Sequence, residues 1–371
     1  MTTTNPAQKG NLLVALELSN KNWRLAFSNG QKVRHVQVVA RDLRALKAAI
    51  EEAKEKLGLA ADCPVYSCYE AGRDGFWIHR ALEKLGVRNV VVEPASIEVS
   101  RRGRRVKTDR LDADSLVRML MRYVLHGEKK VWRVVVVPGV KEEEERQLNR
   151  EYRRLRKERG EHLSRIRSLL ALHGVRVRKV VGMDPKFLRD WEGRELPVKV
   201  QEDLRREQAR LALVDEQLRE VERELRQGIR EPQTAVERTA AKLSRLRGIG
   251  VHGAATLARE VFGWRRFGNR RQVGAYAGLT GTAYASGQKV VEQGISKAGN
   301  PWVRSTMVEL AWMWIWHQRE SELTQWFVRR FGSGGKRARR IGIVALARKL
   351  LVALWRYVEF DEVPAGAIVA A

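Results

Sequence analysis

The sequence has few of the features that mark secreted, membrane-spanning or zinc-dependent proteins. Only two of its 371 residues are cysteine, and Cys63 and Cys68 fall in or next to one predicted strand, so neither a disulfide framework nor a zinc site is indicated. The seven histidines are far apart and form no ligand pattern. No run of about 18 apolar residues is present, and residues 1–11 lack the apolar stretch of a signal peptide. We therefore expect a soluble, cytoplasmic protein.

Acidic residues are also scarce relative to basic ones. The chain has 71 Lys and Arg against 44 Asp and Glu, which leaves a formal net charge of +27. An excess of this size points to a polyanionic partner, and nucleic acid is the first candidate. A membrane surface also attracts basic proteins, but the sequence offers no apolar segment to anchor it. We therefore expect a protein that works at the nucleoid and has no membrane partner.

The first part of the sequence has the pattern of an α/β domain. Residues 12–18 form an almost unbroken apolar run, which is typical of a strand buried on both faces. The segments that follow predict two strands, a helix, a strand, a helix and a strand, at 23–27, 32–39, 41–57, 65–69, 75–85 and 87–92. An apolar-periodic helix that opens near residue 107 completes the order.

Acidic side chains lie in the first predicted strand, at the end of the fourth strand and at the start of the later helix. Glu17 stands inside the first strand, where a carboxylate is costly unless a partner such as a bound cation compensates it. Glu70 ends the fourth strand, where it is also explained as a solvated strand end. Asp109 and Asp112, three residues apart on a helix, would present two carboxylates on one face. The alternative for them is a helix start, because the helix dipole favours Asp in the first turn.

The order of elements is that of a ribonuclease-H-like, or RuvC-like, domain, in which acids from the first strand, the fourth strand and a later helix meet in one cleft. Glu17, Glu70, Asp109 and Asp112 occupy those places. They would hold one or two Mg²⁺ ions, which can activate an attacking oxygen and stabilise a leaving one in phosphodiester cleavage. Asp114 is expected to be a solvated neighbour or a substitute for Asp112. A basic run just before the helix would hold the phosphate backbone, and it consists of Arg101, Arg102, Arg104, Arg105 and Lys107.

Two long helical segments follow. The first begins near Lys141 and carries a leucine-rich stripe among many basic residues, which either lie along a nucleic-acid backbone or form a solvated face. The basic residues expected to bind nucleic acid there are Arg153, Arg154 and Lys157. The second segment has leucines seven apart, which predicts a coiled-coil seam at Leu204, Leu211, Leu218 and Leu225. The seam would pair either with the preceding helix or with its copy in another protomer.

The carboxy-terminal part has small-residue turns between helices. Residues 243–260 read as a helix end, a Gly-Ile-Gly turn and a new helix, which resembles a helix-hairpin-helix contact to DNA or an ordinary helical hairpin. Ser286 lies in a small-residue segment where a strained turn would expose its hydroxyl, although a serine beside a glycine is usually just a turn. No adjacent His or Asp is present to activate it. The tryptophans of residues 310–358 are expected in a core rather than on a base-stacking surface.

Four stretches, in this order and spacing, resemble the DEDD-type insertion-sequence transposases, which include the pilin-inverting recombinase and the bridge-RNA-guided recombinases. They are KTDRLDA at 107–113, AYAGL at 275–279, SG at 286–287 and GISKAGN at 294–300. The resemblance spans roughly residues 11–357. It implies a RuvC-like domain at 1–138, a helical coiled-coil region at 139–238, and a mostly helical C-terminal transposase domain at 239–371.

The resemblance also assigns site residues. Glu70, Asp109 and Asp112 match the second, third and fourth acids of the family, and Ser286 matches its nucleophile, whereas Glu17 stands where the family has Asp. The last stretch and the helix after it are expected to contact nucleic acid through Lys297, Asn300 and Arg304.

A mechanism and partners are implied in the same way. The serine, activated by a neighbouring metal, would attack a DNA phosphodiester and leave a covalent phosphoserine and a free hydroxyl. A structured guide RNA would select donor and target DNA, and dimers would assemble into a tetramer in which the acids of one protomer face the serine of another. Two other interpretations stay open: a RuvC-like junction endonuclease in which water attacks, and a DNA-binding derivative whose catalysis is impaired by Glu17.

Overall fold

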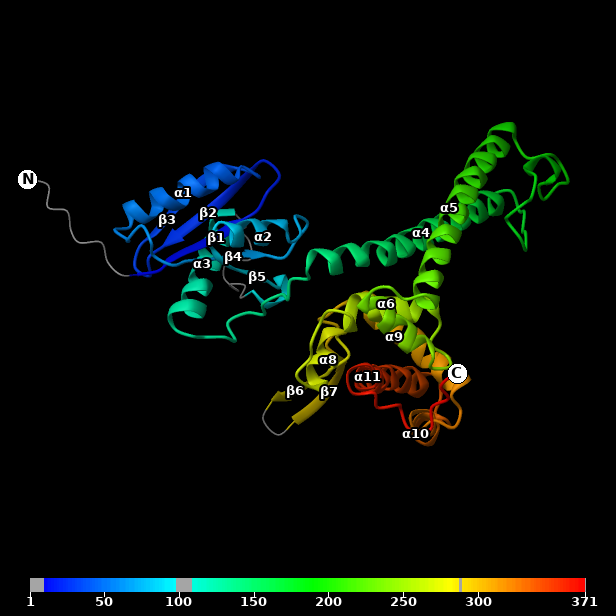
Figure 1. Cartoon of the computed structure of the whole chain (residues 1–371). Helices are drawn as coiled ribbons and strands as arrows, with labels where there is room; N and C mark the ends of the chain where they lie inside the picture. The colour runs from blue at the N-terminus through cyan, green and yellow to red at the C-terminus, as the bar shows by residue number, and fades with distance from the viewer. Residues whose placement is uncertain (1–9, 98–108, 287–288, 371) are drawn as a thin grey trace, which may run out of the picture. The chain divides into compact units, whose positions relative to one another are not determined.

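The contacts of the computed structural model divide the chain into two units, 1–137 and 138–371 (Figure 1). The structure describes residues 10–97, 109–286 and 289–370. The predicted coiled-coil region and carboxy-terminal domain both fall within the second unit, and a boundary between them at residue 238 stays a prediction. Within the described ranges, no helix is both long and apolar enough to cross a bilayer.

The first unit is built on a five-stranded mixed sheet with strand order β3-β2-β1-β4-β5. β1 is antiparallel to β2 and parallel to β4, β3 is antiparallel to β2, and β5 is parallel to β4. The predicted order of strands and helices is confirmed. The elements are β1 (Leu12–Glu17), β2 (Asn22–Ser28), β3 (Val33–Val39), α1 (Leu43–Lys56), β4 (Val65–Glu70), α2 (Trp77–Lys84), β5 (Arg88–Val92), the short 3-10 turn η1 (Pro94–Ser96) and α3 (Asp109–Leu125).

β1 is the middle strand because its apolar run can be buried on both faces. Leu12, Val14 and Leu16 pack with residues of α1 and α2, whereas Leu13 and Ala15 pack with α3. None of these side chains is more than 1% exposed. The sheet is therefore the middle of three layers, with α1 and α3 on opposite faces (Figure 1). Each buried leucine contributes about 1.5–3 kcal/mol, so this strand anchors the unit.

Two long helices of the second unit form an antiparallel hairpin. Leu155 of the first helix packs with Val221 of the second, and farther along Ile166 packs with Leu204. The predicted coiled-coil seam is therefore confirmed, and its partner in the structure is the preceding helix of the same chain. The elements are α4 (Val140–Ala171), the 3-10 turn η2 (Pro185–Phe187) and α5 (Val198–Arg230).

One position of the α5 seam holds an acid. Glu207 follows Leu204 by three residues and is only 2% exposed. Its carboxylate is hydrogen-bonded to His162 at 2.7 Å, to Arg165 at 3.1 Å and to Arg210 at 2.5 Å. Burial raises the pKa of Glu207, but the bonds to His162 and Arg165 outweigh it and hold the pKa below its ordinary value. The buried carboxylate of Glu207 reaches His162 and Arg165 in only one alignment of the two helices. The contact therefore fixes the register of α4 against α5.

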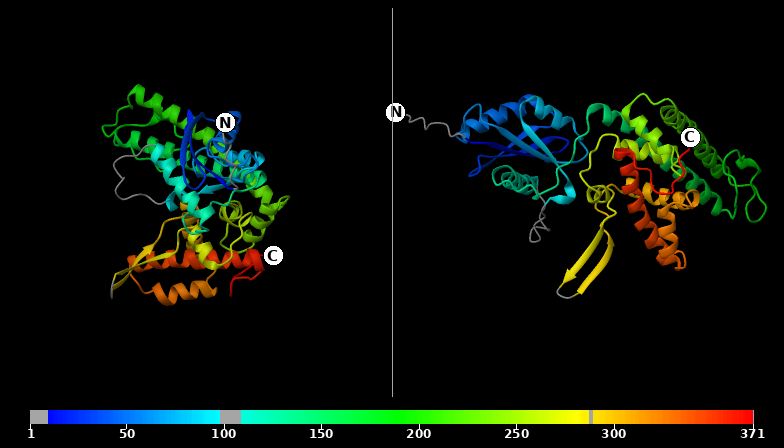
Figure 2. Two further views of the ribbon diagram at one scale, coloured as in Figure 1. Left: turned by 90° about the vertical axis from the view of Figure 1, so that its left-hand side faces the viewer. Right: turned by 60° about the horizontal axis from the view of Figure 1, so that its bottom comes forward.

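The rest of the second unit is mainly helical, with one two-stranded hairpin that stands out from the helices (Figure 2). Trp314 is fully buried in its core, as expected for the tryptophan cluster, but Trp312 and Trp316 are 46% and 71% exposed. The elements are α6 (Ala235–Ser244), α7 (Val251–Leu257), the π-helical turn η3 (Ala258–Phe262), α8 (Arg270–Tyr276), β6 (Gly281–Ser286), β7 (Lys289–Ile295), α9 (Pro301–His317), α10 (Glu322–Phe331) and α11 (Lys336–Phe360).

The predicted helix, glycine turn and helix are present as α6 and α7. Gly248 has a φ of +90°, and a Cβ atom there would lie 3.1 Å from the carbonyl oxygen of Met313. The side chain of Gln318 donates a hydrogen bond to the carbonyl oxygen of Arg247 at 2.8 Å. The turn is therefore packed against α9 and its end, which explains the glycine without a DNA contact. Binding of DNA by this turn stays a prediction.

Acid should loosen the α4–α5 hairpin through Glu207. Because its folded-state pKa is lowered, its contribution to stability is complete above the ordinary glutamate pKa and is lost as the pH falls through the lowered value. We expect the unfolding temperature, followed by circular dichroism, to fall between about pH 5 and pH 3, and Glu207→Gln to remove part of that dependence. Glu216→Gln, on an exposed position of the same helix, is the control. An equal effect of both substitutions would contradict this role of Glu207.

Candidate active site

The carboxyl ends of β1 and β4 lie side by side, and each strand ends in a glutamate. The parallel register between them runs as far as the pair Leu16 and Tyr69. One further step along both strands sets Glu17 next to Glu70. Two carboxylates in neighbouring places repel each other unless a cation lies between or beside them.

The sheet face of these glutamates follows from the residues before them. Ala15 and Cys68, two positions earlier, pack in one cluster with Ala113 of α3. Every second residue of a strand shares a face, so Glu17 and Glu70 lie on the face that α3 covers. Glu17 is partly buried, whereas Glu70 is exposed.

α3 runs antiparallel to β1, so its first turn lies toward the same edge of the sheet. The Sγ atom of Cys68 lies 3.8 Å from the carbonyl oxygen of Leu116. Near the other end of the helix, Sδ of Met121 lies 3.8 Å from Oγ of Ser28, which is beside the start of β1. Asp112 precedes Leu116 by one turn and therefore lies on the side of the strand ends that carry the glutamates.

The predicted acids thus come from elements that meet at one edge of the sheet. Asp112 is partly buried, and Asp109 is the first residue of α3, where the structure describes the main chain. Among the side chains that the structure describes, no group of three or more His, Cys, Asp or Glu is close enough to hold a metal ion. The metal site therefore stays a prediction that the topology favours.

Other charges around this edge differ from the sequence-based expectation. An oxygen of the Asp114 carboxylate lies 3.0 Å from Nε2 of His35 on β3, so Asp114 is not simply a solvated neighbour of Asp112. Arg24 of β2 lies directly across from Glu17 in the antiparallel register. Sequence reasoning missed Arg24, although fixing the register of the first two strands would have found it. The predicted basic residues Arg101, Arg102, Arg104, Arg105 and Lys107 lie outside the described residues.

Ser286 belongs to the second unit and is the last residue of β6. It pairs with Lys289 of β7, so it stands at the end of the hairpin (Figure 2). A strained turn was predicted at Ser286. In the structure, the small residues of this segment form a strand, and Ser286 is its last residue. The structure describes the main chain of this serine, and its role as a nucleophile stays a prediction.

Two of the motifs in the second unit are hydrogen-bonded to each other. The amide of Asn300 donates to the carbonyl oxygen of Tyr276 at 2.8 Å, and the amide of Lys297 donates to that of Gly278 at 3.1 Å. A Cβ atom on Gly299 would lie 2.5 Å from the amide nitrogen of Gly278. The glycines of both motifs are therefore required for close backbone packing.

The predicted nucleic-acid contacts near this packing have structural partners. One guanidinium nitrogen of Arg304 donates to the carbonyl oxygens of Ala277 at 3.2 Å and Lys297 at 3.0 Å. The side chain of Asn300 caps α9 by accepting hydrogen bonds from its first amides. Lys297 is exposed and has a φ of +55°. Binding of nucleic acid by these three residues stays a prediction.

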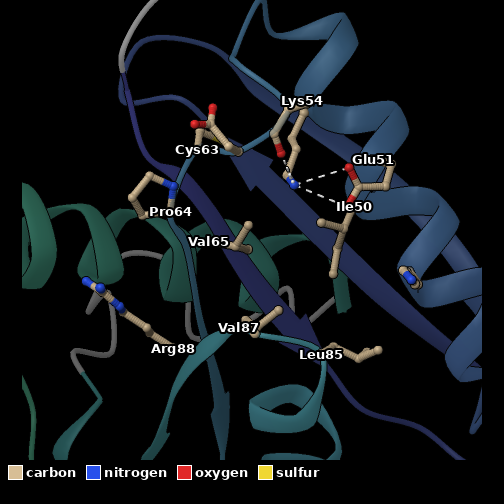
Figure 3. A pocket seen from close by; sticks show the side chains of 13 residues that line it. Ile50, Glu51, Lys54, Cys63, Pro64, Val65, Leu85, Val87 and Arg88 are labelled. Atoms are coloured by element: carbon tan, nitrogen blue, oxygen red, sulfur yellow. Dashed lines mark hydrogen bonds and ion pairs between the residues drawn. The ribbon is translucent and has the colours of Figure 1, made fainter.

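A hollow lies at the opposite end of the sheet from the glutamates (Figure 3). It is lined by residues that begin strands, including Val65 and Arg88, and by the buried Cys63. Lys54 is held there by Glu51 and by the carbonyl oxygen of Ala61. Burial raises the pKa of the Cys63 thiol, which disfavours the reactive thiolate. This hollow is therefore the weaker candidate for an active site.

Comparison with known proteins indicates a transposase family, as the four sequence motifs did. Residues 240–325 match the model of the transposase IS116/IS110/IS902 family. A protein of Sinorhizobium fredii named "Putative transposase y4rJ" is 41% identical, over 97% of this chain and 94% of the relative. The transposase for insertion sequence element IS1328 of Yersinia enterocolitica is 24% identical, over 80% of this chain and 84% of the relative. The chain belongs to the IS116/IS110/IS902 family of transposases, which are DNA-cleaving and strand-transferring enzymes.

Proposed function

We propose that the protein cleaves and rejoins DNA strands through Ser286, assisted by Mg²⁺ that Glu17, Glu70, Asp109 and Asp112 hold in a RuvC-like domain. The observation that supports this proposal is the parallel register of β1 and β4, which runs up to Leu16 and Tyr69, the residues just before Glu17 and Glu70. A central strand flanked by one antiparallel and one parallel neighbour fits a ribonuclease-H-like sheet.

The donor set fits the metal. Mg²⁺ prefers oxygen ligands and is commonly bound by a few carboxylates together with water and phosphate oxygens. Glu17 and Glu70 supply carboxylates from neighbouring strand ends, and Asp112 lies toward the same edge from α3. When bound, the metal would neutralise charge on the phosphate and favour the ionised form of an attacking oxygen.

Strand transfer by Ser286 would conserve the phosphate ester. Its hydroxyl oxygen forms a bond to phosphorus while the bond to the leaving strand breaks, and the hydroxyl proton passes overall to the leaving oxygen. The product is a phosphoserine and a strand with a free hydroxyl. Attack by another strand's hydroxyl reverses the step and restores the serine, so no energy-rich cofactor is required.

The proposed partners are donor DNA, target DNA and a structured guide RNA, in the cytoplasm. The net charge of +27 suits binding to such polyanions. Contacts from Arg153, Arg154 and Lys157, all exposed on α4, would follow the backbone rather than read bases. Because the acids and Ser286 belong to different units, we further propose a composite site in a tetramer of two dimers.

A second candidate function is a RuvC-like endonuclease in which water attacks. It is favoured by one observation: all four predicted acids belong to the first unit, whereas Ser286 belongs to the second. The third candidate, a DNA-binding derivative impaired by Glu17 in place of Asp, predicts no cleavage at all.

Ser286→Ala should abolish the covalent protein–DNA adduct that forms with Mg²⁺ and the element's end DNA. The adduct is measured by denaturing electrophoresis with labelled DNA. Thr282→Ala, which removes another hydroxyl from the same strand, should leave the adduct unchanged. Cleavage that persists in the Ser286 variant without an adduct would favour the water-dependent endonuclease.

Glu70→Gln should lower the rate of strand cleavage on the order of 10²-fold or more, because it removes a charge that the metal requires. Chelation with EDTA should stop cleavage by the unmodified protein, and added Mg²⁺ should restore it. Glu55→Gln on the exposed face of α1 is the control and should cleave normally. A Glu70 variant as active as the control, or no cleavage with either Glu17 or Glu17→Asp, would contradict the proposed metal site.

A further inference from the structure

A groove of about 560 Å³ lies in the second unit between α4, η3 and the beginning of α9. Basic side chains of α4 form one wall, Trp302 stands at the other side, and Glu260 of η3 lies at the floor. Arg150, Arg154 and Lys157 recur at helical spacing, so they share one face of α4.

At the deep end of this groove, the basic side chains are paired with an acid of the protein itself. Oε2 of Glu260 accepts a hydrogen bond from Arg146 at 2.7 Å, and Oε1 accepts one from Arg150 at 3.3 Å. Glu260 is 1% exposed and Arg146 is 8% exposed, so this ion pair is part of the protein interior. It ties α4 to η3 and fixes the floor of the groove.

The outer part of the groove carries positive charge without compensation. Among the described residues, neither Arg153 nor Arg154 has an ion-pair partner, and the guanidinium of Arg153 lies over the ring of Trp302. Lys157 pairs with Glu161 at 3.5 Å, but both side chains are exposed, and such pairs contribute little. Cations gathered in this way favour an anionic ligand, and the described residues supply no buried acid to pair with them.

Trp302 gives the groove a second kind of recognition. It is partly exposed, and the guanidinium of Arg153 lies 5.0 Å from the centre of its ring. The first amides of α9 are already capped by Asn300, so the helix end is not the anion site. The Arg153 guanidinium lies over the ring, so a base that stacks on Trp302 would take the other face or replace this contact. Aromatic rings next to cations are what single-stranded nucleic acids meet in proteins that stack their bases.

We propose that this groove binds a segment of single-stranded nucleic acid, with phosphates against Arg154 and Lys157 and one unpaired base on Trp302. A duplex keeps its bases stacked within the helix, so it offers no free base to the Trp302 ring. The inference rests on the part of the proposed function that assigns α4 to nucleic-acid contacts. It is independent of the acids and of Ser286.

The base-stacking part is tested by equilibrium binding of the full-length protein to labelled twelve-nucleotide probes: single-stranded DNA, single-stranded RNA and the matching DNA duplex. Trp302→Ala should weaken single-strand binding by about 5- to 150-fold and leave duplex binding unchanged. Trp302→Phe should retain most of the affinity. The control is Trp316→Ala, which removes an exposed ring of α9 outside the groove and should have no effect.

The phosphate part is tested by the salt dependence of the same binding. The double variant Arg154→Gln with Lys157→Gln should lower the slope of log affinity against log salt by about 1.4, since each single-strand phosphate contact contributes about 0.7. Arg167→Gln, on an exposed position of α4 outside the groove, should bind like the unmodified protein. The single-stranded probe, DNA or RNA, whose affinity falls more in the variants identifies the kind of strand that the groove binds.

The outcomes separate the inference from the proposed function. If the charge variants weaken binding but Trp302→Ala does not, α4 contacts nucleic acid and the single-strand groove is wrong. If neither variant differs from its control, both the groove and the proposed contacts of α4 are wrong. Equal losses for duplex and single strand in Trp302→Ala would also overturn the groove.

Discussion

The parallel pairing of β1 with β4 is the constraint on which the first unit depends. An almost unbroken apolar strand must be covered on both faces, and this requirement fixes β1 in the middle of the sheet with α3 on one side. Because that pairing sets Leu16 opposite Tyr69, the residues that follow, Glu17 and Glu70, come at neighbouring strand ends. The acidic edge is thus a consequence of how the hydrophobic core is built.

The second unit relies on polar contacts held inside apolar packing. Glu207 fixes the register of the α4–α5 hairpin, and Glu260 ties α4 to η3. Removing one partner of such a buried pair leaves an uncompensated charge and costs about 3–5 kcal/mol. Both contacts hold the basic face of α4 in a defined place, as the proposed binding of nucleic acid there requires.

The sequence was sufficient for the features that depend on periodicity. The strands of the first unit, the seam at Leu204 and the glycine turn at Gly248 were predicted because apolar spacing and small residues determine them locally. The choice between the two partners offered for the seam was left open, and neither Arg24 opposite Glu17 nor the Arg153–Trp302 contact was predicted. Each depends on register or on packing between segments distant in sequence, which spacing alone does not encode.

The central claim is that Glu17, Glu70, Asp109 and Asp112 converge on a metal ion. The most direct measurement is anomalous X-ray scattering from crystals of the protein soaked in Mn²⁺, a substitute for Mg²⁺. The account predicts a peak at the edge formed by Glu17, Glu70 and the first turn of α3, lost in Glu70→Gln. A well-ordered edge with no peak, or a peak held by other residues, would contradict it.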